Sequence, residues 1–264
     1  MVNIPEKITP PINRSTVMSL NKRYDAPINK RNVMSLNNRT GSANTAPRTP
    51  SAPSVPPQRQ TSPSAAPAPA PVRDLAFPHL MNPLRKGQKS ALDAQGRGLH
   101  RIEAHFGWNI RDSRCDLDAS AFLVGKNGRV PADEWFVFYG QEESPDRSVR
   151  FAVDGSGRER EIITIDLDRL SPAIVKIVLV LTINEAFENS LNFSMIKEAY
   201  VRIIDPSTGR ELVSYRPEEY YAAVTSMTIG EVYLHNGAWK FNPVGNGVKM
   251  DLADQCAVYG VAIC

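Results

Sequence analysis

The residues best suited to chemistry lie in the stretch 115–125, Cys-Asp-Leu-Asp-Ala-Ser-Ala-Phe-Leu-Val-Gly. Its apolar middle and the Lys-Asn-Gly turn signal after it predict a β-strand. Successive side chains of a strand point to opposite faces, so Asp116 and Asp118 share one face, about 6–7 Å apart. Two carboxylates this close repel unless a positive charge lies between them. A hard cation such as calcium, which binds carboxylate and carbonyl oxygens, would relieve the repulsion.

The same pair has a simpler interpretation, because Asp-x-Asp at a strand end can be a turn cap or a solvated pair. The stretch is not an EF-hand loop, which needs Gly at its sixth position and Glu at its twelfth. Counted from Asp116, the sixth position is Ala121. A cation site therefore needs further ligands from elsewhere in the chain.

Composition divides the 264 residues into two parts. Of the 21 Pro residues, 15 lie in the first 83 positions. Residues 1–79 hold ten Lys/Arg and three Asp/Glu, a balance of +7, while the other 21 Lys/Arg and 25 Asp/Glu give −4. The overall charge of +3 thus hides a basic tail joined to a mildly acidic domain, and it does not indicate specific nucleic-acid binding.

We expect residues 1–79 to be a disordered tail, because the Pro/Ala/Ser-rich stretch 48–72 cannot bury a core. Ahead of it, residues 12–23 recur as residues 28–39, each copy with a Val-Met-Ser-Leu-Asn centre between basic residues. Two such motifs on a tether are typical of a bivalent docking peptide. A recent duplication in a drifting tail would produce the same pattern, and both interpretations stay open.

No segment has the length of a membrane span or the apolar core of a signal peptide. The most apolar run, Ile174–Ile183, is too short to cross a bilayer and contains Lys176. The three cysteines are an odd count without metal-type spacing, which favours a reducing cytosol.

From Leu80 onward, short apolar runs alternate with Gly, Asn, Asp and Pro turns, which predicts an all-β sandwich of two mostly antiparallel sheets over residues 80–264. Helical or irregular connections are expected only at Glu185–Lys197 and Pro217–Ala223. The expected strands are 99–108, 115–125, 134–139, 161–167, 174–183, 200–204, 211–215, 231–234 and 239–241, with the last four forming two hairpins.

The order of these motifs resembles the TerD family of tellurite-resistance and stress proteins, over roughly Leu80 to Val248. The most specific string is Asp-Leu-Asp-Ala-Ser-Ala-Phe-Leu at 116–123. The other carrying motifs are Lys-Gly-Gln-Lys at 86–89, Gly-Trp-Asn at 107–109, Phe-Val-Phe-Tyr at 136–139, Ser-Pro-Asp at 144–146, Arg-Ile-Ile-Asp at 202–205, Thr-Gly-Arg-Glu-Leu at 208–212 and His-Asn-Gly-Ala-Trp-Lys-Phe at 235–241.

The resemblance implies a β-sandwich that binds calcium and has no established catalytic activity. It further implies a bacterial cytoplasmic protein of stress and tellurite resistance, peripheral to the inner membrane face. Its partners would be other tellurium-resistance-type proteins and a membrane protein. By the same resemblance the cation ligands include Asp116, Asp118 and the Asn184-Glu185 pair.

One loop departs from the family pattern. In the shorter stretch 153–161, Asp154 matches the aspartate of the family's Gly-Asp-Asn and Glu161 its closing glutamate, but Arg158 and Arg160 have entered. The two guanidinium groups could pair with the carboxylates and occupy the place of a cation. We therefore expect at most one full-strength calcium site, and a metal-independent scaffold or interaction protein stays open as the alternative.

The sequence predicts no enzyme. The four histidines, His79, His100, His105 and His235, lie in no arrangement typical of a catalytic triad. The Asp-Gly-Ser-Gly loop at 154–157 lacks the Lys-Ser/Thr context of a phosphate-binding loop. No Cys-x-x-Cys precedes the histidine pair at 100 and 105, which argues against a structural zinc site.

Overall fold

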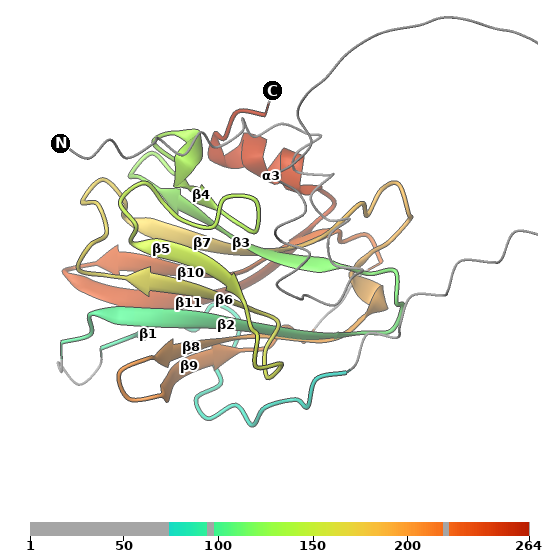
Figure 1. Cartoon of the computed structure of the whole chain (residues 1–264), viewed down its shortest axis with the longest axis horizontal. Coiled ribbons are helices and arrows are strands. Elements are labelled where there is room, and N and C mark those ends of the chain that lie inside the picture. The colour runs from blue at the N-terminus through green and yellow to red at the C-terminus, as the bar shows by residue number, and fades with distance from the viewer. Residues whose placement is uncertain (1–73, 94–97, 219–221, 264) are drawn as a thin grey trace, which may run out of the picture. The chain divides into compact units, whose positions relative to one another are not determined.

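A computed structural model of the chain describes residues 74–93, 98–218 and 222–263. Both tail repeats lie outside the described residues. Within the described residues, the strands form one five-stranded sheet, sheet A, and one six-stranded sheet, sheet B (Figure 1). All paired strands are antiparallel, which confirms the predicted all-β sandwich.

The two sheets are assembled from strands that are far apart in the chain. Sheet A has the order β5 (Val149–Val153), β6 (Glu161–Asp166), β2 (Arg101–Ile110), β8 (Ile196–Asp205) and β9 (Arg210–Tyr215). Sheet B has the order β1 (Ser90–Ala91), β11 (Ala238–Val248), β10 (Ser226–His235), β7 (Lys176–Ile183), β3 (Leu117–Val124) and β4 (Phe136–Val137). Two 3₁₀ turns, η3 (Asp133–Trp135) and η4 (Phe193–Met195), and the helix α3 (Leu252–Tyr259) complete the described elements.

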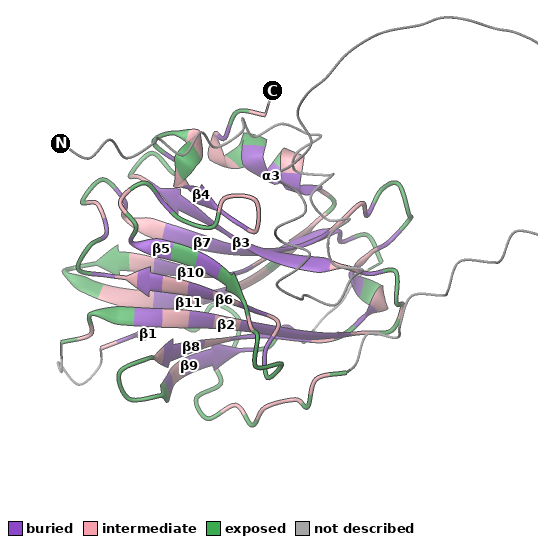
Figure 2. Ribbon diagram, viewed as in Figure 1, coloured by how far each residue is buried: buried purple, intermediate pink, exposed green. Residues whose placement is uncertain are grey.

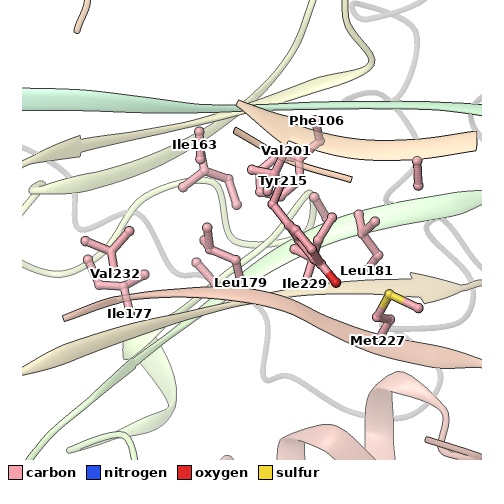
Figure 3. Packing of buried hydrophobic residues seen from close by; sticks show 14 of the residues in the cluster. Phe106, Ile163, Ile177, Leu179, Leu181, Val201, Tyr215, Met227, Ile229 and Val232 are labelled. Atoms are coloured by element: carbon pink, nitrogen blue, oxygen red, sulfur yellow. The ribbon is translucent and has the colours of Figure 1, made fainter. Parts of the chain in front are cut away.

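The main core lies between the two sheets, as the alternation along each strand predicts. Phe106, Ile163 and Val201 of sheet A face Leu179 and Ile229 of sheet B, and all five are fully buried (Figure 3). On β3 the predicted inward set, which comprises Leu117, Ala119, Ala121 and Leu123, belongs to this core. Burying such side chains contributes roughly 1.5–3 kcal/mol each.

A second apolar layer covers the outer face of sheet B. Phe122 stacks on Phe136 at 4.3 Å and on Tyr259 of α3 at 4.5 Å, between ring centroids. The helix adds the buried Leu252 and Cys256 to this layer. As a result every residue of β3 is buried, whichever face its side chain occupies (Figure 2).

Most predicted strands are present, with differences that have local causes. The tight hairpin turn at Asn236-Gly237 is confirmed, because both residues have positive φ angles of 52° and 75°. The predicted strand 134–139 is wrong for most of its length, since residues 133–135 form a 3₁₀ turn and only Phe136–Val137 pair with β3. The helix α3 is an additional element, and residues 219–221 of one expected irregular connection lie outside the described residues.

Residues ahead of the tail boundary predicted at 79/80 contact sheet A. Both the N–H and the carbonyl of Leu75 bond to the side-chain amide of Asn109, at 2.7 and 3.0 Å. The Phe77 ring lies edge-on to Tyr200 at 4.9 Å. The Leu75 main chain and the Phe77 ring therefore have partners on sheet A, and we expect the folded domain to include them.

These contacts predict different outcomes for two truncations. Deleting residues 1–73 should leave the melting temperature nearly unchanged, because their composition offers little apolar surface to bury. Deleting residues 1–80 also removes the aromatic pair and the Asn109 bonds, each worth about 1 kcal/mol, and should lower Tm by roughly 4–8 °C. Calorimetry of the full chain and the two truncations checks this, and equal melting temperatures for the two truncations would contradict this expectation.

Candidate metal centre

The predicted ligands of β3 and β7 lie next to each other because of the strand register. Asp118 is the partner of Thr182, and Asn184 continues the ladder by donating its N–H to the Asp116 carbonyl at 2.8 Å. Side chains two residues apart share a face, so Asp118 lies on the same outer face of sheet B as Phe122. The start of β3 and the end of β7 thus meet at one corner of this sheet.

A cavity of about 20 Å³ lies at this corner, a size that accommodates one water molecule or one metal ion. Its lining includes several acidic and other polar residues and contains no Lys, Arg or His. The lining residues are Asp118, Tyr139, Thr182, Ile183, Asn184, Glu185, Glu188, Asp251, Leu252 and Ala253. The side chains of these lining residues include four carboxylates, one amide and two hydroxyls, and the space itself is of ionic size.

One lining hydroxyl is buried without a partner. Thr182 is 4% exposed, and its Oγ1 has no hydrogen-bond partner among the described residues. The Ser120 Oγ, on the same face of the neighbouring strand, is in the same state. Because leaving a buried hydroxyl unpaired costs about 1–3 kcal/mol, a cation or a water molecule in the cavity would relieve this cost at the Thr182 oxygen.

A tight turn after β7 presents the next two acids. Glu185 has a φ angle of 46°, a left-handed conformation that non-glycine residues rarely adopt. The Asn189 side chain holds this turn by donating to the carbonyl and to Oε2 of Glu185, both at 3.3 Å. The strained backbone places Glu185 and Glu188 together at the cavity.

Asp251 reaches the cavity from the far end of the chain. It is the N-cap of α3, and its Oδ1 accepts the Asp254 N–H at 2.8 Å. The Asp254 carboxylate accepts the Asp251 N–H in return, which completes a capping box. The positive end of the helix dipole at this cap partly offsets the negative charge of the cavity.

Glu161 comes from the other sheet and lies beside the same corner. It is 5% exposed, and its Oε2 accepts the Ala119 N–H at 2.6 Å. Burial, followed by the charge of Asp118, raises the pKa of Glu161 well above its usual range, and Asp116 adds to the effect while the Ala119 bond opposes it. A cation near these carboxylates would reverse the shift.

Asp154, the remaining predicted ligand, is engaged in its own loop. Its carboxylate accepts the N–H groups of Ser156, Arg158 and Glu159 at 2.8–3.0 Å, together with the Ser156 hydroxyl at 2.7 Å. It is not one of the residues that line the cavity. Its role as a ligand stays a prediction that this geometry does not favour.

The two arginines of this loop do not line the cavity either. Arg160 donates from Nε to the Trp108 carbonyl at 3.2 Å, beside β2 of sheet A. Arg158 is exposed, and its N–H is held by Asp154. The expectation that guanidinium groups occupy the place of the cation therefore has no counterpart among the residues around the cavity.

Sequence reasoning missed four lining residues that carry polar side-chain groups: Tyr139, Thr182, Glu188 and Asp251. Glu188 had a weak signal, because it stands three residues after Glu185 in a short connection. Asp251 had the signal of a capping box, Asp-x-x-Asp, but not of a ligand. Thr182 looks like any β-branched strand residue, and its unpaired hydroxyl is visible only in three dimensions.

The acidic side chains of the described residues do not form a complete set of metal ligands. No three of their His, Cys, Asp and Glu side chains converge closely enough to hold one ion, so the acids surround the cavity without forming a finished coordination sphere. In the part of the chain that the structure describes, no helix is long and apolar enough to cross a membrane.

Comparison with known proteins places this geometry in a family. The TerD domain matches residues 81–259. Tellurium resistance protein TerD of an Alcaligenes species is 36% identical over 186 residues, 67% of this chain and 96% of the relative. The protein of the same name in Serratia marcescens is 35% identical with the same coverage of both chains. General stress protein 16U of Bacillus subtilis (strain 168) is 34% identical over 188 residues, 68% of this chain and 97% of the relative.

The matched region contains both sheets and every lining residue of the cavity, while residues 74–80 precede it. These matches confirm the resemblance that the motifs at 116–123 and 235–241 indicate. The chain belongs to the TerD family of tellurium-resistance and general stress proteins.

Proposed function

We propose that this protein is a calcium-binding stress protein without enzymatic activity that serves as an adaptor in a bacterial cytoplasmic complex near the membrane. The observation that carries the proposal is the ion-sized cavity, which has four acidic residues and no basic residue in its lining, together with the unpaired Thr182 hydroxyl. The relatives that bear the names tellurium resistance protein and general stress protein support the biological setting.

The donor set fits calcium in its chemistry. Calcium binds six to eight oxygen ligands in flexible geometry, whereas magnesium requires a tight octahedron and gives up its water reluctantly. Asp118, Asn184, Glu185, Glu188 and Asp251 would hold the ion, together with the Thr182 hydroxyl. When bound, the ion would supply positive charge to the corner at which these carboxylates repel one another.

The histidine contacts support a protein without catalysis. His100 Nδ1 lies 2.6 Å from an Asp168 carboxylate oxygen, and His105 Nε2 lies 2.9 Å from a Glu103 oxygen. Among the described residues, neither ring contacts a Ser, Thr or Cys side chain in a recorded hydrogen bond, so neither forms a pair typical of nucleophilic catalysis.

The partners in this proposal are other tellurium-resistance-type proteins and a membrane protein, and the tail repeats at residues 12–23 and 28–39 would be the docking motifs. Their twofold arrangement suits a bivalent or oligomeric partner, because the tether raises the effective concentration of the second motif. No specific nucleic-acid partner is proposed. The metal-independent scaffold stays the alternative, and the unfinished coordination sphere is the observation in its favour.

Calcium should raise the stability of the folded chain. Because the ion binds only the folded arrangement, a hundredfold excess over Kd should add about 2.7 kcal/mol. Melting of the full chain in chelator, millimolar calcium and millimolar magnesium, with calorimetric titration, measures this, and magnesium should do less. Asp118→Asn should abolish the gain, whereas the exposed Asp168→Asn, a matched control away from the cavity, should keep it.

Thr182→Val refines this test, because valine has nearly the same shape without the hydroxyl. It should stabilise the cation-free chain by about 1 kcal/mol and weaken calcium binding. Identical melting of the wild type in chelator and calcium, with no heat on titration, would favour the metal-independent scaffold.

The pH dependence of stability should report the repulsion at Glu161. The folded-state pKa lies above the usual 4.5, so the folded chain retains a proton that the unfolded chain has released. The contribution to stability is therefore complete below about pH 4.5 and is lost as pH rises through the folded-state pKa.

Glu161→Gln removes this titration. In chelator, it should gain stability relative to wild type between pH 5 and pH 8, measured by urea unfolding. Glu134→Gln, an exposed change in the turn η3, should follow the wild type throughout. A Glu161→Gln curve parallel to that of the wild type would show that the carboxyl group titrates normally.

The two tail repeats should act together. Replacing Val17, Met18 and Leu20 with Ser should weaken partner binding moderately, and replacing Val33, Met34 and Leu36 as well should weaken it far more than the two separate losses combined. Quantitative co-purification from the bacterial host measures this, with Ser51→Ala in the spacer as control. A partner retained equally by all variants would exclude the repeats as docking motifs.

A further inference from the structure

The segment of residues 74–84 lies along the outer face and edge of sheet A. Asn109 and Tyr200, which hold Leu75 and Phe77, alternate with the core residues of β2 and β8 and thus belong to the outer face. Farther on, Pro83 forms a parallel bridge with Ser214 at the β9 edge, and the Leu84 N–H donates to the Ser214 carbonyl at 2.8 Å. We call residues 74–80, which precede the family domain, the strap.

The sheet carries a specific receptor for the strap backbone. Asn109 is 4% exposed, and its side chain bonds to both main-chain polar groups of Leu75, as a neighbouring strand would. It also donates to Glu198 Oε2 at 3.3 Å, which orients the amide. A buried side-chain amide that bonds to both main-chain polar groups of one residue can hold an extended peptide, as a sheet edge does in strand addition.

The surface that contacts the Phe77 side chain is also positioned by specific contacts. A Cβ atom at Gly107 would lie 2.2 Å from Cζ of Tyr200, so only glycine leaves room for this ring on the sheet. Glu159 accepts a hydrogen bond from the Tyr200 hydroxyl and pairs with Arg202 Nη1 at 2.8 Å. Arg202 in turn donates from Nε to Glu211 at 2.8 Å. The Tyr200 ring beneath Phe77 is therefore held by the bond to Glu159 and by the space at Gly107, and neither of these contacts involves the strap.

The strap is more exposed than the surface on which it lies. None of the residues 74–83 is buried, whereas Asn109, Glu159 and Tyr200 are. The ion pair of Asp74 with Lys197, at 2.9 Å, joins two exposed side chains and contributes little in water. A segment that stays partly exposed on a buried surface can open locally at a low free-energy cost, and such opening permits exchange.

We propose that the outer face of sheet A is a peptide-docking surface and that its second occupant is the strap of another copy of this chain. The strap is the sequence that the structure shows to fit the surface, so a second copy offers a matching ligand. The chain's own strap has a high effective concentration, so exchange requires many copies close together, as a multivalent partner of the tail would provide. The surface shares no residue with the metal cavity, so the proposal does not depend on calcium.

The test uses the full chain and a fluorescent peptide of residues 73–83. In Phe77→Ala the chain's own strap loses its aromatic anchor, so the peptide should bind this variant at least tenfold more tightly than the wild type, measured by anisotropy. A peptide with Phe77 replaced by Ala should lose this binding, which controls for non-specific attachment without altering the folded chain. Equal weak binding of both peptides to the Phe77→Ala chain would overturn the docking surface.

The second occupant is tested by the oligomeric state. Light scattering of the wild type should show a dimer fraction that rises with concentration and is dissociated by excess peptide, and Phe77→Ala should stay monomeric. A wild-type chain that stays monomeric at millimolar concentration while the peptide binds would exclude a second copy as the occupant. Both experiments are run in chelator and in calcium, and the expected results are the same, so failure of the calcium proposal is distinguishable from failure of this one.

Discussion

The register between β3 and β7 is the constraint on which both the core and the cavity depend. It pairs Asp118 with Thr182, and it directs Ala119 and Ala121 into the space between the sheets. Because side chains alternate with a period of two, a slip by one residue would turn the aspartates toward the core and the alanines toward α3. The apolar layers on both faces of β3 oppose this slip, so the packing that stabilises the sandwich also holds the acids in place.

Repulsion among the acidic side chains raises the free energy of the folded chain unless other contacts offset it. The edge of β3 is covered by β4 only at Ala121 and Phe122, and the carboxylate of Glu161 accepts the N–H of Ala119 beyond that point. A backbone donor and a helix N-terminus are weak compensation for several carboxylates at one corner. The raised pKa of Glu161 reflects first its burial and then repulsion by Asp118, and a cation bound nearby would oppose both effects.

Sequence patterns predicted the parts of the fold that local chemistry controls. The apolar run of β7 and the Asn-Gly turn between β10 and β11 are local signals, and both elements are present. The predicted strand 134–139 failed because aromatic residues can fill a layer under α3 as well as a strand, as the Phe136 and Phe138 rings do at 4.6 Å. The helix α3 was missed although Asp251 and Gly260 mark its ends with a capping box and a left-handed C-cap.

The candidate site likewise contains residues that the sequence predicted and residues that it did not. The Asp-x-Asp motif singled out Asp118, and the family resemblance singled out Asn184 and Glu185. All three line the cavity, because strand pairing, which follows from the hydrophobic pattern, brings the start of β3 next to the end of β7. Asp251 lies 133 residues after Asp118, and no local signal reports a contact at that distance in the chain. Asp154 shows the opposite case, since an acidic residue next to Gly and Ser satisfies its own loop as readily as it binds a metal.

Both outer faces of this sandwich are covered by segments from the ends of the described chain, which changes how its polar groups can be interpreted. Antiparallel sheets usually leave one face to water, so polar residues there need no partner. Here α3 covers sheet B and contributes Asp251 to the cavity, while the strap covers sheet A above the pairs of Glu159 and Arg202. Helix α3 and the strap each shield charged groups that would otherwise be solvated, so the interactions of these groups depend on the covering segment staying in place. The segments that flank the central strands are therefore parts of the two candidate surfaces, and a shortened domain is not a neutral substitute for the full chain.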